Sequence, residues 1–113
     1  MKWSTRELAE LAQTTVNTIR HYHHLGLLDE PDRGPNGYKQ YGAKDLIRLL
    51  RVRRLVGLGV PLSQIGAAAD SGDGIRETLR QLDAEIVASI QRLLQVRSDI
   101  LANLCDEARA ERS

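Results

Sequence analysis

The chain has 113 residues, room for one small domain and an extension, and a domain of this size is marginal on its own core. It contains no Phe and only four other aromatic residues, so the core must be aliphatic. The single cysteine, Cys105, excludes an intramolecular disulfide and fits a reducing cytoplasm. No apolar run approaches the ~18–20 residues that span a bilayer, so no membrane partner is expected.

Missing motifs argue against two further classes of protein, and the distribution of charge indicates the kind of partner. The chain shows no nucleophile elbow and no phosphate-cradling glycine loop, which argues against an enzyme and against a bound cofactor. The formal net charge of +1 hides an asymmetry: residues 1–60 hold ten Lys or Arg against six Asp or Glu, and residues 61–113 hold six against nine. The positive field that suits nucleic acid therefore lies on the N-terminal half.

The first predicted elements are two short helices joined by a tight turn. Ser4 followed three residues later by Glu7 is a capping-box pattern, which indicates a helix over residues 4–12. The second helix follows from Thr15, and its apolar face carries Val16, Ile19 and His23. Its other face carries the side chains that we expect to contact a partner: Thr15, Asn17, Thr18, Arg20, His21 and Tyr22. This arrangement predicts a helix-turn-helix whose second helix enters a DNA groove.

A small two-stranded wing is predicted next. Residues 29–41 are dense in turn formers, and Asn36-Gly37 is the strongest short hairpin signal. The wing should present Arg33, Tyr38 and Lys39 together. A surface loop that happens to contain a lysine is the alternative, and the helix-turn-helix directly upstream favours the wing.

A third helix is predicted over residues 42–58, and a short fourth helix that begins after Pro61 should pack back onto it. Basic residues on a helix usually form a solvated face, which is our interpretation of Arg51 and Arg54. Arg48 and Arg53 are instead predicted to reach the phosphate backbone beside the wing.

The remaining residues predict a linker and one long helix. We divide the chain into a DNA-binding domain at 1–70, a linker at 71–74 and a dimerisation helix at 75–113. Apolar residues at steps of three and four indicate a coiled-coil seam about 50 Å long. The seam carries Ile75, Leu79, Leu82, Ile86, Ile90, Leu93, Val96, Ile100 and Leu104. No second long helix covers this stripe, which favours a homodimer.

Several of these motifs together resemble the MerR family of bacterial transcription regulators. The match follows the family's order and spacing over roughly the first seventy residues. It rests on Arg20-His21-Tyr22, Leu25-Gly26-Leu27-Leu28, Gly37-Tyr38-Lys39-Gln40-Tyr41, Asp45-Leu46 and Leu58-Gly59-Val60-Pro61-Leu62-Ser63-Gln64-Ile65. The chain departs from the family at His21, at His23 and at Lys39, where the family usually has Tyr, an acidic residue and Arg.

The resemblance implies a mainly α fold, a winged helix-turn-helix followed by an antiparallel coiled-coil helix. It also implies a regulator that binds the overlong spacer of a promoter as a homodimer and bends and untwists the DNA, with RNA polymerase as the neighbouring partner. Chemistry then suggests the roles. Arg20, Arg33 and Lys39 should contact phosphates, and Tyr22 and Tyr38 phosphate and sugar, while Thr15, Asn17, Thr18 and His21 should reach base edges, with Asn17 suited to adenine.

Two alternatives stay open from the residues alone. A metal site at His21 and His24 is disfavoured because His23 points elsewhere and no other ligand is adjacent, although two copies of Cys105 meeting across a dimer would be a second route to one. In the other alternative, the long helix binds a different partner chain and the helix-turn-helix is only a scaffold. The charge asymmetry argues against that alternative, since a scaffold has no need of a basic wing.

Overall fold

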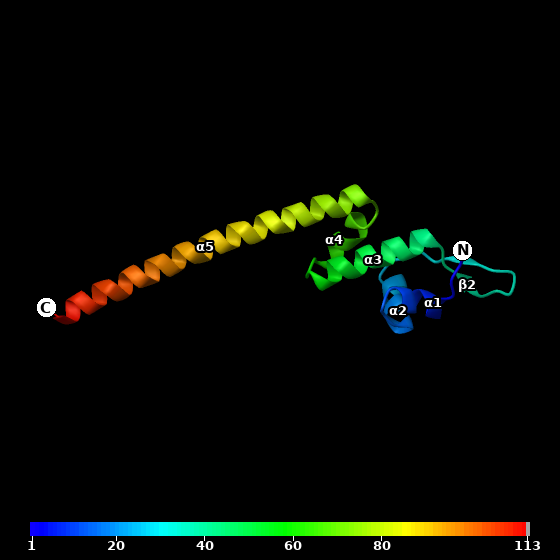
Figure 1. Cartoon of the computed structure of the whole chain (residues 1–113), viewed down its shortest axis with the longest axis horizontal. Coiled ribbons are helices and arrows are strands. Elements are labelled where there is room, and N and C mark those ends of the chain that lie inside the picture. The colour runs from blue at the N-terminus through cyan, green and yellow to red at the C-terminus, as the bar shows by residue number, and fades with distance from the viewer. Residues whose placement is uncertain (113) are drawn as a thin grey trace. The chain divides into compact units, whose positions relative to one another are not determined.

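The computed structural model describes residues 1–112, so Ser113, the last residue of the predicted dimerisation segment, lies outside the described part. The chain divides into two compact units, Met1–Arg76 and Glu77–Ser113. The first unit contains α1 (Thr5–Leu11), α2 (Val16–His24), β1 (Asp32–Arg33), β2 (Lys39–Gln40), α3 (Ala43–Gly57) and α4 (Leu62–Ala68). Helix α5 (Gly72–Arg112) begins in the first unit and continues through the second (Figure 1). The mainly α fold with a β wing is confirmed.

Side-chain caps begin both helices of the predicted helix-turn-helix. The Ser4 hydroxyl accepts from the Glu7 N–H at 3.1 Å while the Glu7 carboxylate accepts from the Ser4 N–H at 2.9 Å, as the capping-box pattern predicts. The Thr15 hydroxyl accepts from the Thr18 N–H at 3.1 Å and so begins α2. Between the two helices Gln13 adopts φ of +55°, which turns the chain sharply enough for α2 to pack against α1.

The wing forms around the Asn36-Gly37 turn. Gly37 has φ of +79°, a conformation that glycine adopts without strain, and the Asn36 side chain accepts from the Tyr38 N–H at 3.2 Å. The two strands pair antiparallel, with Arg33 opposite Lys39. An additional antiparallel bridge joins Trp3 to Tyr41, with both N–H to carbonyl distances below 3.0 Å. The N-terminal segment therefore pairs with the chain at the base of the wing. No local sequence pattern predicted this pairing.

The core of the first unit is mainly aliphatic, as the composition predicted, with Tyr22 and Tyr41 as its aromatic members. Its fully buried side chains are Tyr41, Leu8, Ile19, Leu49, Leu55, Ile65 and Val52. Helix α3 supplies three of these, and α4 packs back onto it, which confirms that prediction. The buried stripe of α3 is narrow, because Ile47, Leu50 and Val56 remain 48%, 40% and 39% exposed.

Arginines of α3 cap other elements of the same unit. Arg53 donates to the carbonyl of Ala12, the C-cap of α1. Arg48 donates to the carbonyls of Leu27 and Gly66 at 2.6 and 3.2 Å, and it forms an ion pair with Asp70. Carbonyls at the C-terminal end of a helix lack intrahelical donors and favour a positive charge, so these bonds satisfy groups that would otherwise be unpaired.

Helix α5 begins earlier than predicted. The 71–74 segment was expected to be a linker, but α5 starts at Gly72, and the Gly74 N–H bonds to the Ser71 hydroxyl at 2.9 Å. The side-chain cap by Ser71 outweighs the helix-breaking tendency of the two glycines. Within the residues that the structure describes, no helix combines the length and apolar composition needed to cross a membrane.

Candidate nucleic-acid interface

Helix α1, helix α2 and the wing together line a basic groove of about 440 Å³. Its cations are Arg6, Arg20, Arg33 and Lys39, and the remaining lining residues are Ser4, Thr5, Val16 and Tyr38. Four of the residues predicted to contact DNA, Arg20, Arg33, Tyr38 and Lys39, thus meet at one site. Tyr38 is 73% exposed, so its ring is available to a partner. We call these eight residues the basic groove.

Two cations of the basic groove lie directly opposite each other. Arg33 pairs with Lys39 in the strand register, and like charges opposite one another on a sheet are destabilising. Two contacts moderate this cost: Arg33 donates to the Gly37 carbonyl at 2.8 Å, and Lys39 forms an ion pair with Glu30 at 3.1 Å. The hydrogen bond from Lys39 lowers the pKa of the Glu30 carboxyl below its ordinary value. The wing therefore places two cations side by side at the groove, and within residues 1–112 only Lys39 of the two forms an ion pair.

A polar cluster beneath the groove fixes the wing against α2. His23 is part-buried, with its side chain 7% exposed, and its Nε2 lies 3.0 Å from the Tyr41 hydroxyl. Its Nδ1 lies 3.2 Å from the carbonyl of Leu28. The Tyr41 hydroxyl also accepts from Thr5 at 3.5 Å, so the cluster connects α1, α2 and the residue that follows β2. His23 thus lies inward, as predicted, and its imidazole contacts groups of the same unit.

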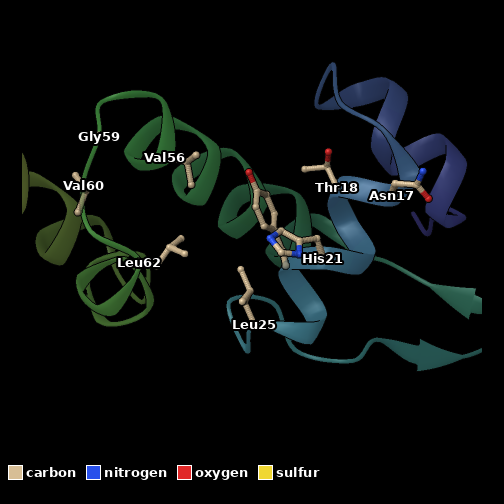
Figure 2. A pocket seen from close by; sticks show the side chains of 9 residues that line it. Asn17, Thr18, His21, Leu25, Val56, Gly59, Val60 and Leu62 are labelled. Atoms are coloured by element: carbon tan, nitrogen blue, oxygen red, sulfur yellow. The ribbon is translucent and has the colours of Figure 1, made fainter.

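The outer face of α2 presents polar side chains beside a second, largely apolar hollow. Asn17, Arg20, His21 and His24 are exposed, and Thr18 is half-buried. The hollow, about 650 Å³, is lined by Asn17, Thr18, His21, Tyr22, Leu25, Val56, Gly59, Val60 and Leu62. Figure 2 shows His21 on α2 and Leu25, the residue that follows α2, at one side, with Val56 and Leu62 on the other. The hydroxyls of Thr15 and Thr18 lie 3.0 Å apart, so one hydroxyl hydrogen remains available for another acceptor.

Three predicted contact residues lie elsewhere than expected. Tyr22 was placed on the outer face of α2, but it is 7% exposed and belongs to the core, because its large ring buries more apolar surface than it would leave in contact with a partner. Arg48 and Arg53 were predicted to reach phosphates. Their guanidinium groups instead bond to carbonyls within the unit, which uses their donors for packing.

One residue of the basic groove, Arg6, was not predicted from the sequence as a DNA contact. Arg6 lies in the first turn of α1, where the helix dipole disfavours a positive charge. Its guanidinium has no acidic partner among residues 1–112, and it faces the same groove as Arg20. An arginine that is both poorly placed for its helix and unpaired was the signal that would have identified it.

In the second unit, helix α5 exposes most of the predicted seam. Ile86, Ile90, Leu93, Val96, Ile100 and Leu104 are between 47% and 61% exposed, while Leu79 and Leu82 are half-buried. Three further apolar residues, Val87, Leu94 and Leu101, are 45%, 59% and 47% exposed. The apolar face is therefore wider than the single seam that the sequence predicted. The lone thiol, Cys105, is exposed near the end of this helix.

Comparison with known proteins identifies relatives of this chain. Residues 3–71 match the family described as MerR HTH family regulatory protein. The nodulation protein NolA of Bradyrhizobium sp. (strain NC92) is 33% identical over 91% of this chain and 43% of its own length. The regulator SkgA from Caulobacter crescentus superposes with a TM-score of 0.60 at 30% identity, over 92% of this chain and 78% of that one. HiNmlR, a MerR family regulator lacking the sensor domain and bound to promoter DNA, gives 0.62 at 27% identity, over 84% and 80%.

The helix-turn-helix, the wing and the groove between them define a winged helix-turn-helix protein. Because the family match covers more than half of the chain, the chain belongs to the MerR family of regulatory proteins. Of the relatives named above, SkgA and HiNmlR are described as regulators. The chain spans less than half of the length of the curated relatives it matches, between 43% and 46% for three NolA proteins.

Proposed function

We propose that the chain is a sequence-specific DNA-binding transcription regulator that acts as a homodimer. The observation that carries this proposal is the basic groove, where cations from α1, α2 and both strands of the wing converge. Phosphate contacts supply most of the affinity of DNA-binding proteins, and a groove with unpaired arginines is suited to them. The promoter complex of the relative HiNmlR supports DNA as the partner.

Each residue of the site has a role suited to its exposure. Arg20, Arg33 and Lys39 contact phosphates, with Arg6 added to the predicted set, and Tyr38 packs its exposed ring against sugar. On the outer face of α2, Asn17 and His21 contact base edges, with Asn17 suited to adenine. Thr15 and Thr18 share one available hydroxyl hydrogen between them and contribute secondary contacts.

The homodimer follows from the second unit. A helix whose apolar side chains are about half exposed over several turns requires another surface, and a second copy gives two basic grooves on one complex. The operator is then an inverted repeat. Holding duplex DNA bent between two fixed clamps costs on the order of 1–6 kcal/mol, which several phosphate contacts per protomer offset. A distorted promoter spacer would make RNA polymerase the neighbouring partner.

Fluorescence anisotropy on the protein's own upstream DNA tests the groove. Arg20→Ala and Lys39→Ala should weaken binding to all sequences, and each should lower the salt slope by about one per contact and site. The matched control is Arg92→Ala, which removes the same charge from an exposed position on α5. Equal affinity and slope in all three variants would exclude the groove as the phosphate site, and would favour the alternative in which the helix-turn-helix is a scaffold.

Chemical footprinting tests the distortion separately. Hyper-reactive base pairs are expected at the centre of the inverted repeat, where the protein touches no bases, and circular permutation should detect a bend. Straight, unreactive DNA at saturation would instead indicate a steric repressor on the same fold.

A further inference from the structure

The apolar face of α5 contains two charges in its middle. Three columns of residues run along the helix at seven-residue spacing. They are Ile86, Leu93 and Ile100, then Asp83, Ile90, Arg97 and Leu104, then Val87, Leu94 and Leu101. On an α-helix residues three and four apart are neighbours, so the column with Ile90 lies between the other two. Asp83 and Arg97 therefore interrupt a face whose other side chains are apolar and exposed.

The two charges are opposite in sign and symmetric about one residue. Asp83 stands seven residues before Ile90, and Arg97 stands seven residues after it. Among residues 1–112 neither side chain has an ion-pair or hydrogen-bond partner, and about 21 Å of helix separates them. A charge covered by apolar surface is costly unless an opposite charge meets it. Whatever covers this face must therefore bring a positive group to Asp83 and a negative group to Arg97.

We infer that a second copy of this chain covers the face in an antiparallel orientation with Ile90 at the two-fold axis. Asp83 of each copy then pairs with Arg97 of the partner subunit. This inference rests on the homodimer proposed above and assigns the register of its helices. In a two-fold symmetric contact, residue i meets residue j and residue j meets residue i, so this one pattern supplies both ion pairs. Charges at the seam of a coiled coil set the orientation and the choice of partner.

Other pairings of the same face leave the charges unpaired. In a parallel pair Asp83 would meet Asp83, and Arg97 would meet Arg97. An antiparallel pair shifted by one heptad toward the C-terminus places Arg97 level with Ile90 and Asp83 level with Leu104. The shift toward the N-terminus places Asp83 level with Ile90 and Arg97 level with Arg76. Only the register centred on Ile90 gives each charge an opposite partner.

Charge exchange on the full chain tests the register. Asp83→Arg alone would place two arginines level with each other twice per dimer, and Arg97→Asp would do the same with two aspartates. Each variant should raise the dissociation constant of its own homodimer about tenfold. When the two variants are mixed, both ion pairs reform, so native mass spectrometry should show mainly the mixed dimer. The double variant D83R/R97D should dimerise as the original chain does, and circular dichroism checks that α5 stays helical in all four proteins.

Thiol cross-linking tests the same register without changing a charge. In a Cys105→Ala background, Ile90→Cys places two thiols at the two-fold axis, and a short bifunctional reagent should join them. The unaltered chain is the control. Its two Cys105 thiols would lie about 45 Å apart in this register and should not cross-link, whereas a parallel dimer would place them level with each other.

The outcomes separate the register from the proposed function. Charge variants that dimerise as tightly as the original chain and mix at random would overturn the register, and so would cross-linking through Cys105, while DNA binding by a homodimer would stand. An unaltered chain that is monomeric at micromolar concentration would overturn both the homodimer and its register, and a different protein would then cover the face.

Discussion

The two units of the chain cover their apolar side chains in different ways. In the first unit Leu8, Ile19 and Leu49 are fully buried by elements of the same chain. In the second unit Ile86 and Leu93 are 57% and 60% exposed, although the helix around them is continuous. The first unit therefore has its own core, whereas the second unit is helical by local propensity and requires another surface. Stability should be decided in the first unit, and assembly in the second.

The largest expected effect is on DNA affinity, in a variant that abolishes assembly through the second unit and leaves the stability of the first unit unchanged. Ile90→Asp places a charge in the apolar face of α5 at the proposed dimer axis, which should convert the dimer to monomer in light scattering. DNA affinity should then fall by about 10²-fold or more, because the two half-sites are no longer held together. The thermal melting of the first unit should not change. Gln91→Asp is the matched control, since it adds the same charge at the adjacent exposed position. A dimeric Ile90→Asp variant would mean that the contact lies elsewhere.

Leu49→Ala tests the first unit alone. Leu49 is fully buried on α3, so its truncation leaves a cavity and should cost about 2–5 kcal/mol in chemical denaturation. The neighbouring Leu50 is 40% exposed, and Leu50→Ala should cost less than half as much. Similar losses for both variants would contradict the narrow buried stripe of α3.

Arg48→Ala distinguishes packing from DNA contact. Because Arg48 bonds to Leu27, Gly66 and Asp70, its removal should lower the free energy of unfolding by about 1–3 kcal/mol. The salt slope of DNA binding should stay unchanged, unlike the slope for Arg20→Ala. Arg54→Ala, an exposed arginine on the same helix, should change neither quantity. A reduced slope with unchanged stability would restore the original prediction of a phosphate contact.

The smallest expected effect concerns the ion pair in the wing. Glu30→Gln should free Lys39 and strengthen DNA binding about two- to fivefold, with a salt slope increased by about one. Asp32→Asn removes a nearby exposed charge that forms no ion pair within residues 1–112, and it should leave the slope unchanged.

The pH dependence of that pair follows from the direction of its shift. The pKa of Glu30 is lowered in the folded protein, so the pair is fully formed above the ordinary carboxyl range and is lost only as the pH falls through the lowered value. The difference between Glu30→Gln and the original chain should therefore be constant between pH 6 and 8. If the difference in DNA affinity varies between pH 6 and 8, a titrating group other than Glu30 causes it.

Sequence patterns were most informative where the structure is local. The caps by Ser4 and Thr15 and the turn at Asn36-Gly37 each join groups within three residues of one another. The same holds in part for the basic groove. Local patterns predicted the second helix and the wing, and these elements carry Arg20, Arg33 and Lys39. Arg6 was missed because its unfavourable position in the first turn of α1 becomes informative only when the structure shows that it has no acidic partner among residues 1–112.

What the sequence by itself determined is the set of elements and the face of each that carries charge, because periodicity, caps and turn residues act over a few positions. The tertiary structure decided which charged and aromatic side chains remain available to a partner. Arg53 bonds to a carbonyl 41 residues away, and Trp3 pairs with Tyr41, which lies 38 residues further along the chain. Tyr22 became a core residue for the same reason: whether an amphipathic side chain is buried depends on which elements meet around it, and that is settled only when the whole core is packed.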